Sequence, residues 1–431
     1  VMVEQMKPSG IDWIGDIPKS WKVTRLQTLF DQVKDKNSGT KEKNLLSLSY
    51  GKIVKKDIEG AFGLIPESFD TYNIIKKNDI VLRLTDMQND QVSLRTGLVK
   101  EEKGIITSAY VTIRLKCGSP SYYHWYLYAF DTSKQIYAFG QGVRQSLTFE
   151  ELKKMLILLP SPKEQQAIAD FLDEECAQID SIAADLEKQI VLLQQYKKSL
   201  ITETVTKGLD KSAPMKDSGV EWIGKIPEHW QKTRIKFEAS IIGSGTTPDS
   251  GNSMYYDNGE HSWIQSGDLY GKDYIYETEK QLTNLAILEC HALNWYTKDF
   301  VVVAMYGASV GNVAISKIDS FTNQACCVIK LNEKNDNRYL FYFLKAAQEE
   351  MLLKAFGGTQ PNISQIIIKN LNFLNVPLLE QIEIADFLDS KCDMINEMLK
   401  SKKDQYDILI KHKKSLIYEY VTGKKRVKEV Q

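Results

Sequence analysis

Two long stretches of the chain, one after Pro160 and one after Pro377, carry apolar residues at nearly every seventh position. Such a heptad pattern over about 43 residues predicts a helix with a coiled-coil seam, which would span about 65 Å. Only Lys402 interrupts the pattern, and we interpret it as a register device or as a side chain that reaches solvent. The seam positions are Leu172, Ile179, Leu186, Leu193 and Leu200 in the first stretch and Leu388, Ile395, Leu409 and Leu416 in the second.

Two equivalent seams in one chain favour antiparallel pairing of the two helices with each other. Packing of either seam against a sheet or against another subunit stays open as an alternative.

Each stretch follows a region in which short apolar runs are bounded by Gly, Asn and Asp. The runs "NDIVLRLT" at 78–85 and "KDFVVVAMYG" at 298–307 predict β-strands. The aromatic segments "HWYLYAF" at 124–130 and "YLFYFLK" at 339–345 predict helices whose rings pack in a core. Each region, called a head below, is therefore predicted to be a compact mixed α/β domain.

The chain contains an internal repeat. The segment "SGIDWIGDIPKSW" at 9–21 returns as "SGVEWIGKIPEHW" at 218–230, and "EQQAIADFLD" at 164–173 returns as "EQIEIADFLD" at 380–389. From about Ala109 and Ala325 onwards, the two copies are expected to align without a gap at an offset of 216. Between about Arg25 and Ser108 the first copy differs from the second, which predicts two similar heads that contact two different targets or two different parts of one target.

The repeat also predicts where the domains end, with a linker rich in Gly, Pro, Ser and charged residues between the halves. The expected segments are an N-terminal conserved segment (1–21), the first head (22–158), a central long helix (159–208), the linker with the repeated tryptophan motif (209–231), the second head (232–376), and a C-terminal long helix with a basic tail (377–431).

Composition places the chain among ordinary globular proteins, with 43% apolar and 26% charged residues. No apolar run approaches the roughly 18–20 residues of a membrane span, so we expect a soluble, cytoplasmic protein. Cysteines and histidines lack metal-ligand spacing, and the cysteines, including Cys176 and Cys392 beside the seams, are expected to be reduced. With 55 basic and 56 acidic residues, the overall charge gives no sign of a nucleic-acid partner.

The sequence lacks the phosphate-binding loop, the dinucleotide fingerprint, the nucleophile elbow and the H-E-x-x-H zinc motif. One pattern resembles a metal-dependent nuclease, because Asp79 precedes Glu101 in an E-x-K triplet. The repeat provides a control, since Asp299 lies at the same place before the equivalent strand and no such triplet follows it. We therefore interpret Asp79 as a strand-start residue and keep a nuclease as a minor hypothesis.

Two variable segments, each preceded by W-I-G-x-I-P-x-x-W and followed by a long helix that opens with E-Q-x-x-I-A-x-F-L-D, resemble the specificity subunit of type I restriction–modification enzymes. The resemblance covers nearly the whole chain. It implies an α+β fold in which two mixed α/β target-recognition domains, in a pseudo-twofold arrangement, are separated by two long antiparallel coiled-coil helices. It also implies a non-catalytic, DNA-reading subunit for host defence, whose helices separate the two halves of an asymmetric bipartite DNA site.

The resemblance further implies the partners. Double-stranded DNA, two modification subunits that methylate adenine, and two restriction subunits would join this chain. No cofactor is expected in the chain itself, because S-adenosylmethionine, ATP and Mg²⁺ would belong to the partner subunits.

The second head carries polar segments that are similar to the family's recognition loops, where Asn and Gln can pair with adenine and hydroxyls can bind bases or phosphates. The expected DNA-binding residues of the second head are Gly245, Thr246, Thr247, Trp263, Gln265, Ser266, Asp268, Tyr306, Asn323, Gln324, Thr359, Gln360 and Asn362.

The first head lacks the G-x-T-P loop, so its candidates come from different segments, with lysines expected at phosphates and arginines at guanine. They are Tyr50, Lys52, Lys55, Lys56, Arg83, Thr85, Gln88, Asn89, Arg95, Ser108, Tyr110, Arg144, Gln145 and Ser146.

The second head is rich in acidic residues between about 241 and 330, so phosphate neutralisation is expected from lysines near the helix ends, from the tail "GKKRVK" at 423–428, or from partner subunits. The lysines near the helix ends are Lys197, Lys198, Lys411, Lys413 and Lys414. A solvated helix face is an equally good interpretation of them. The alternative function is that of a duplicated, non-catalytic adaptor that binds only proteins.

Overall fold

The computed structural model describes residues 5–56, 68–86, 94–138, 146–356 and 361–427, and the chain divides into two compact units. Unit 1 consists of Val1–Glu187 and Lys403–Gln431, and unit 2 consists of Lys188–Lys402. Each unit therefore contains one head together with part of each long helix. The mixture of helices and strands confirms the predicted α+β class.

The long helices are α4 (Pro162–Lys207) and α10 (Leu378–Val421). Helix α4 starts with a capping box, in which Glu164 accepts hydrogen bonds from the amide and hydroxyl of Ser161 at 3.1 and 2.8 Å. The left-handed backbone of Gly208 and Gly423 stops the chain from continuing either helix. Across the described ranges, no helix has both the length and the apolar character needed to cross a membrane.

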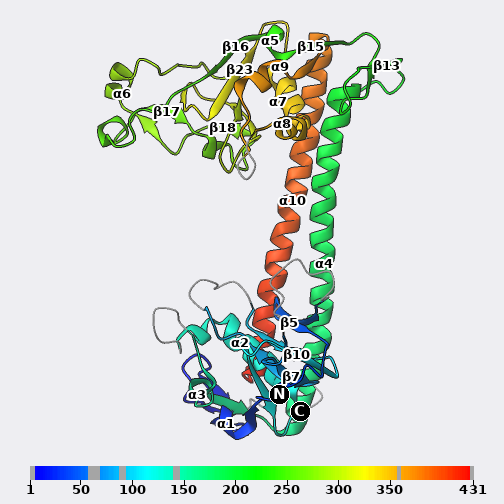
Figure 1. Ribbon diagram of the computed structural model, residues 1–431, viewed down its shortest axis with the longest axis vertical. Coiled ribbons are helices and arrows are strands. Elements are labelled where there is room, and N and C mark those ends of the chain that lie inside the picture. Colours follow the sequence, from blue (N-terminus) through cyan, green and yellow to red (C-terminus); the bar gives the residue numbers. More distant parts are fainter. Residues whose placement is uncertain (1–4, 57–67, 87–93, 139–145, 357–360, 428–431) are drawn as a thin grey trace. The chain divides into compact units, whose positions relative to one another are not determined.

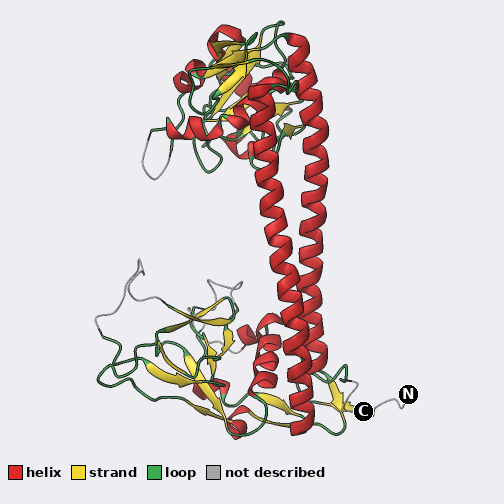
Figure 2. Ribbon diagram, turned by 90° about the vertical axis from the view of Figure 1, so that its right-hand side faces the viewer, coloured by secondary structure: helices red, strands yellow, loops and turns green. Residues whose placement is uncertain are grey.

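The helices pair antiparallel within each unit, where α4 and α10 lie side by side (Figure 1, Figure 2). In unit 1, Asp180 accepts a hydrogen bond from Lys413 at 2.5 Å, and Glu187 bonds to Tyr406, so residue numbers rise on one helix as they fall on the other. In unit 2, Lys197 donates to Asn396 at 2.8 Å. The seam residues are buried at Leu172, Ile179, Leu186, Leu388, Ile395 and Leu416 and half-buried at Leu193, Leu200 and Leu409.

The first head has a central sheet with the strand order β4-β11-β8-β9, covered by the aromatic helix α2 (Pro120–Thr132). Strand β8 falls inside the predicted run 78–85, which confirms that prediction. The other helices are α1 (Leu26–Leu29), η1 (Gln135–Ala138) and α3 (Phe149–Leu152). The strands are β1 (Met6–Pro8), β2 (Asp16–Pro18), β3 (Lys22–Arg25), β4 (Phe30–Gln32), β5 (Leu46–Ser49), β6 (Lys52–Lys55), β7 (Asn73–Lys76), β8 (Ile80–Leu82), β9 (Thr96–Leu98), β10 (Lys103–Ile106), β11 (Val111–Leu115) and β12 (Leu156–Leu159).

The second head is built on a sheet with the order β16-β23-β20-β21-β18, next to a smaller sheet with the order β19-β17-β22. Strand β20 confirms the predicted run at 298–307. The strands are β13 (Met215–Asp217), β14 (Lys225–Pro227), β15 (Gln231–Arg234), β16 (Ala239–Ser244), β17 (His261–Ile264), β18 (Tyr274–Ile275), β19 (Gln281–Leu282), β20 (Phe300–Ala304), β21 (Val313–Ser316), β22 (Phe321–Thr322), β23 (Cys326–Leu331) and β24 (Asn372–Asn375). The helices are α5 (Ile235–Glu238), η2 (Ser253–Tyr255), η3 (Ser266–Leu269), α6 (Asn284–Glu289), α7 (Asn337–Ala346), α8 (Gln348–Leu353) and α9 (Gln365–Asn370).

Each head is closed by an antiparallel pair of strands, β3 with β12 in the first head and β15 with β24 in the second. The chain therefore enters and leaves each head side by side.

The first turn of each long helix binds the repeated tryptophan motif. Glu164 accepts a hydrogen bond from Trp21 Nε1 at 3.1 Å, and Glu380 accepts one from Trp230 Nε1 at 2.7 Å. Both tryptophans are completely buried. In each half of the chain, the repeated tryptophan motif therefore contacts the repeated E-Q motif at the start of the long helix. We call this contact the junction.

The glutamine that follows the junction glutamate holds the helix of the head. Gln165 Oε1 accepts a hydrogen bond from the amide of Ser119 at 3.0 Å, and Gln381 Oε1 accepts one from the amide of Asp336 at 2.9 Å. Ser119 and Asp336 are the N-cap residues of α2 and α7. The E-Q pair thus fixes both the tryptophan motif and the head helix to the long helix.

The equivalent contacts correct the predicted gap-free alignment by one residue in the head helices. Tyr122 donates its hydroxyl to the carbonyl of Val421 at 3.1 Å, and Tyr339 donates to that of Val205 at 3.0 Å. The two valines are 216 positions apart, whereas the two tyrosines are 217 apart. The first head therefore has one extra residue between its head helix and α4, which the sequence comparison could not see because both segments are rich in aromatic residues.

The six cysteines are free, and Cys176 and Cys392 are buried, as expected for reduced thiols. Burial raises the pKa of the Cys176 thiol to about 12, so this thiol stays protonated at neutral pH.

Leu172 is completely buried in unit 1, and Leu172→Ala is expected to lower the free energy of unfolding by about 2–5 kcal/mol because it leaves a cavity. Ile182 on the same helix is 52% exposed, and Ile182→Ala is the matched control, expected to cost less than about 0.5 kcal/mol. Urea denaturation followed by circular dichroism measures both. Equal losses would contradict the buried seam.

Glu164 gives a pH-dependent prediction. Burial alone would raise the pKa of Glu164, but the hydrogen bonds from Trp21 and Ser161, together with Arg426, outweigh burial and leave the pKa below its ordinary value of 4.5. The carboxylate therefore stabilises the fold above pH 4.5, and this stabilisation is lost as the pH falls through the lowered pKa. We expect the stability advantage of the wild type over Glu164→Gln to shrink as acid is added.

Thermal unfolding between about pH 6 and pH 3 checks this expectation. The exposed Glu174 on the same helix provides the control variant, Glu174→Gln. An advantage over Glu164→Gln that does not change with pH would count against the junction carboxylate.

Candidate nucleic-acid interface

In the second head, the polar segments after β17 and β22 emerge at one edge of the small sheet. The two strands are parallel, with Ile264 opposite Thr322. The amide of Asn323 donates to the carbonyl of Ile264 at 2.9 Å. Gln265 after β17 and Gln324 after β22 are therefore brought to the same edge, as chain direction requires.

The G-S-G-T-T-P segment crosses this edge at very close range. A side-chain carbon added to Gly245 would lie 1.7 Å from the carbonyl oxygen of Thr322, so only glycine fits. Two residues later, the hydroxyl of Thr247 hydrogen-bonds to Gln324 Oε1. Gly245 therefore allows the loop to place Thr247 against Gln324, both of which are candidate DNA-binding residues.

Two of the predicted residues are buried and hold the loops in place. Trp263 is 1% exposed and donates from Nε1 to the carbonyl of Thr246 at 3.3 Å. Asp268 accepts hydrogen bonds from the amides of Gln265 at 2.8 Å and Glu279 at 3.2 Å. These two side chains are positioned to orient their neighbours and are not presented to solvent.

The turn after β20 joins the same edge. Ser309 donates its hydroxyl to the carbonyl of Ser266 at 2.6 Å, and Tyr306 in this turn is half-buried. Asn362 is exposed and lies beside the turn, because the amide of the next residue donates to the carbonyl of Met305 at 2.7 Å. The described candidates of the second head are thus brought together at one place, called the recognition edge below, with Trp263 and Asp268 buried beneath its surface.

A hollow of about 750 Å³ opens at the recognition edge and is lined by the predicted residues Thr247, Trp263 and Gln265. Polar residues that the sequence analysis missed also line it, namely Ser250, Ser253, Asn258, Thr278, Lys280 and Gln281. They lie in two segments, 250–258 and 278–281, that belong to no recognised motif, so nothing in the sequence singled them out.

In the first head, the candidate lysines surround a tight hairpin between β5 and β6. Tyr50 is 85% exposed, and both Tyr50 and Gly51 have left-handed backbones, as a two-residue hairpin turn requires. The hairpin packs on β9, where a side-chain carbon on Gly97 would lie 2.6 Å from Leu48. The exposed lysines are Lys52, Lys55 and Lys56.

Arg95, which directly precedes β9, is completely buried. Its guanidinium donates to the carbonyls of Arg83 at 3.2 Å, Thr85 at 2.9 Å and Asp86 at 3.3 Å, while its amide donates to Asp131 at 2.7 Å. Arg83 is half-buried and Thr85 is exposed. Arg95 is therefore placed to hold the 83–86 segment, rather than to meet a base itself.

The other candidates are less connected. Ser108 and Ser146 are exposed, and Tyr110 is half-buried against a small apolar cluster that includes Leu46. Six candidates lie outside the described residues: Gln88, Asn89, Arg144, Gln145, Thr359 and Gln360.

The nuclease-like pattern has a different explanation. Asp79 is 1% exposed and accepts two hydrogen bonds from Arg114, each 2.7 Å long, and a third from the amide of Lys76 at 2.8 Å. Its carboxylate is occupied by this pair at the start of β8, as the strand-start interpretation predicted. Among the described residues, no group of three or more His, Cys, Asp or Glu is arranged to hold a metal ion.

Three of the helix lysines are used inside the fold. Lys197 lies 3.5 Å from Asp273, Lys198 pairs with Glu349, and Lys413 pairs with Asp180. Lys411 and Lys414 are exposed. Each of the first three lysines, which we expected to neutralise DNA phosphates, therefore already has an acidic partner within the chain.

Comparisons with known proteins agree with this architecture. The chain is 24% identical over 427 residues to the type I restriction enzyme MjaVIII specificity subunit of Methanocaldococcus jannaschii, covering 96% of this chain and 95% of that protein. It is 31% identical over 193 residues to the MjaIX specificity subunit of the same organism, covering 44% of this chain and 43% of that protein.

A solved chain from a study of complex assembly and conformational transition of the type I R-M system has a similar fold. Its TM-score is 0.70 at 14% identity, and the match covers 94% of this chain and 98% of that chain. The family model of the type I restriction modification DNA specificity domain matches twice, at residues 18–191 and 227–405. The chain therefore belongs to the type I restriction–modification DNA specificity family.

Proposed function

We propose that each head reads one half of an asymmetric bipartite DNA site within a type I restriction–modification complex. As a member of the specificity family, the chain is a DNA sequence-recognition subunit with two target-recognition domains. The observation that carries the finer proposal is that two unlike polar surfaces are mounted on the same duplicated junction. Because the two heads present different polar surfaces and are attached through equivalent junctions, we expect them to read two different half-sites.

In the second head, the proposed readers are the amides and hydroxyls of the recognition edge. Gln265, Asn323, Gln324 and Asn362 can each offer a donor and an acceptor, the combination that adenine presents in the major groove. In the first head, the β5–β6 hairpin carries lysines suited to phosphates, and the segment held by Arg95 carries Arg83 and Thr85. The buried Trp263, Asp268 and Arg95 act as positioning residues.

The long helices are proposed to set the distance between the half-sites and to dock two methyltransferase subunits. Two restriction subunits would complete the complex. In this proposal the chain is non-catalytic and cytoplasmic, and S-adenosylmethionine, ATP and Mg²⁺ are bound by the partner subunits. The pairing of Asp79 with Arg114 supports the non-catalytic assignment, because the first carboxylate of the nuclease-like pattern already has a structural role.

Mapping of N6-methyladenine in a genome that co-expresses this chain with its modification subunit tests the proposal. We expect a split, asymmetric motif, of which one half changes when residues 26–155 are exchanged for those of a relative. A continuous or palindromic motif would contradict two independent heads. No methylation by a complex that has assembled would favour the protein-binding adaptor.

Gly245→Ala is expected to disturb the recognition edge, because the new side chain meets the carbonyl of Thr322. We expect at least about a tenfold loss of DNA affinity, equal to about 1.4 kcal/mol, with the loss confined to the half-site of the second head. Gly267→Ala is the matched control, since nothing lies within 4 Å of its added carbon. Binding to duplexes in which one half-site is scrambled at a time measures both variants, and equal effects would contradict the placement of the site.

A further inference from the structure

The junction of unit 1 includes a closed cluster of four aromatic rings. The ring centroid of Trp13 lies 5.7 Å from that of Tyr126, 5.8 Å from that of Phe130 and 6.1 Å from that of Tyr418. The hydroxyl of Tyr418, on α10, donates to the carbonyl of Trp13 at 3.0 Å. A residue of the long helix thus occupies the space beside the repeated tryptophan.

The junction of unit 2 retains only half of this cluster. Trp222 is the counterpart of Trp13, and its ring lies 5.4 Å from that of Phe343, the counterpart of Tyr126. With the offsets of 217 in the head helices and 216 in the long helices, Ala347 replaces Phe130 and Thr202 replaces Tyr418. Two large rings are therefore missing beside Trp222.

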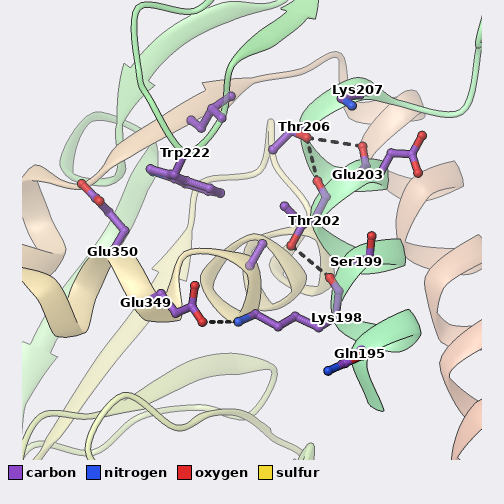
Figure 3. A pocket seen from close by; sticks show the side chains of 12 residues that line it. Gln195, Lys198, Ser199, Thr202, Glu203, Thr206, Lys207, Trp222, Glu349 and Glu350 are labelled. Atoms are coloured by element: carbon purple, nitrogen blue, oxygen red, sulfur yellow. Dashed lines mark hydrogen bonds and ion pairs between the residues drawn. The ribbon is translucent and has the colours of Figure 1, made fainter. Parts of the chain in front are cut away.

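A pocket of about 510 Å³ lies at this place in unit 2. Figure 3 shows Trp222 facing Thr202 and Thr206 of α4 across it, with the Lys198–Glu349 pair at its edge. In unit 1 the side chain of Tyr418 fills the equivalent position, whereas in unit 2 the pocket is open.

The pocket wall includes a buried polar group without a hydrogen-bond partner among the described residues. Thr202 and Thr206 donate their hydroxyls to carbonyls of their own helix, at 3.0 and 2.6 Å. Trp222 Nε1 is buried and has no hydrogen-bond partner among the described residues. A ligand that suits this pocket is an aromatic ring with a polar atom, the chemistry of Tyr418 in the other junction.

We propose that the pocket beside Trp222 receives an aromatic side chain, best a tyrosine, from a methyltransferase subunit that docks on this junction. The inference rests on the proposed function, because it takes that subunit as the partner. The incoming ring packs on Trp222, and its hydroxyl oxygen accepts a hydrogen bond from Trp222 Nε1. An aromatic side chain buried in a partner's pocket is a common centre of binding energy at protein interfaces.

The two junctions are consequently unlike docking places. Tyr418 closes the first from within the chain, whereas the second depends on a residue from the partner. A methyltransferase subunit bound at the second junction gains the aromatic contact, and one bound at the first does not.

Thr202→Tyr tests the proposal by filling the pocket from within the chain, as in unit 1. With the full chain and its modification subunit, we expect the affinity for that subunit at one of two positions to fall at least about tenfold. The unfolding temperature of the free chain is expected to be unchanged or raised, because the variant fills a void. Thr202→Val, which leaves the pocket open, is the matched control and is expected to bind like the wild type.

Titration followed by native mass spectrometry gives both the stoichiometry and the affinities. If Thr202→Tyr does not fold, Ala346→Phe narrows the same pocket from α7. Wild-type binding by a folded, pocket-filling variant would overturn the inference and leave the proposed function intact. A wild-type chain that binds no modification subunit would overturn both.

A photoreactive residue in place of Gln195, which lines the pocket, identifies the occupant directly. We expect it to cross-link to a segment of the modification subunit that contains an aromatic residue. Cross-linking only within this chain or to a second copy of it would overturn the proposal.

Discussion

A carboxylate at the first turn of each long helix, buried in Glu164 and half-buried in Glu380, makes the contact on which the remaining structure depends. Glu164 and Glu380 lie where the helix exposes unpaired amides and a positive dipole end, which favours a negative charge. Each also accepts a hydrogen bond from a fully buried tryptophan of the repeated motif. Because a buried charge without partners is costly, the two parts of the junction hold each other in place.

The junction separates the conserved part of the molecule from the variable part. The glutamine beside each carboxylate binds the N-cap of the head helix, and an antiparallel strand pair closes the head. Sequence changes between those strands that keep the N-cap contact of the head helix leave the junction in place. Such an arrangement suits a protein whose two heads read different sequences while the helices keep their partners.

The two junctions nevertheless differ in how their aromatic side chains pack. Tyr418 and Phe130 complete an aromatic cluster in unit 1, and their counterparts in unit 2 are Thr202 and Ala347. The pocket in unit 2 is open to solvent, so its lining lacks packing contacts on that side. The proposed aromatic side chain of a partner would supply the contacts that this lining lacks.

Sequence alone determined the features that depend on local periodicity and turn chemistry. The heptads predicted α4 and α10, the apolar runs predicted β8 and β20, and the repeat predicted two related heads. The repeat did not reveal the extra residue before α4, because the aromatic pattern of the head helices aligns almost as well one residue out of register. Only contacts to Val205 and Val421 distinguish the two alignments.

Tertiary structure alone decided which polar residues face outward. Arg95, Trp263 and Asp268 look like candidate readers in the sequence, yet each is buried and holds a neighbouring loop. Asp79 resembles a nuclease carboxylate in the sequence, but in the fold it accepts hydrogen bonds from Arg114, which lies 35 positions later. Sequence pattern specifies residue type and local conformation, whereas burial depends on segments that meet only in the folded chain, so the candidate surfaces could be named in advance but their exposed members could not.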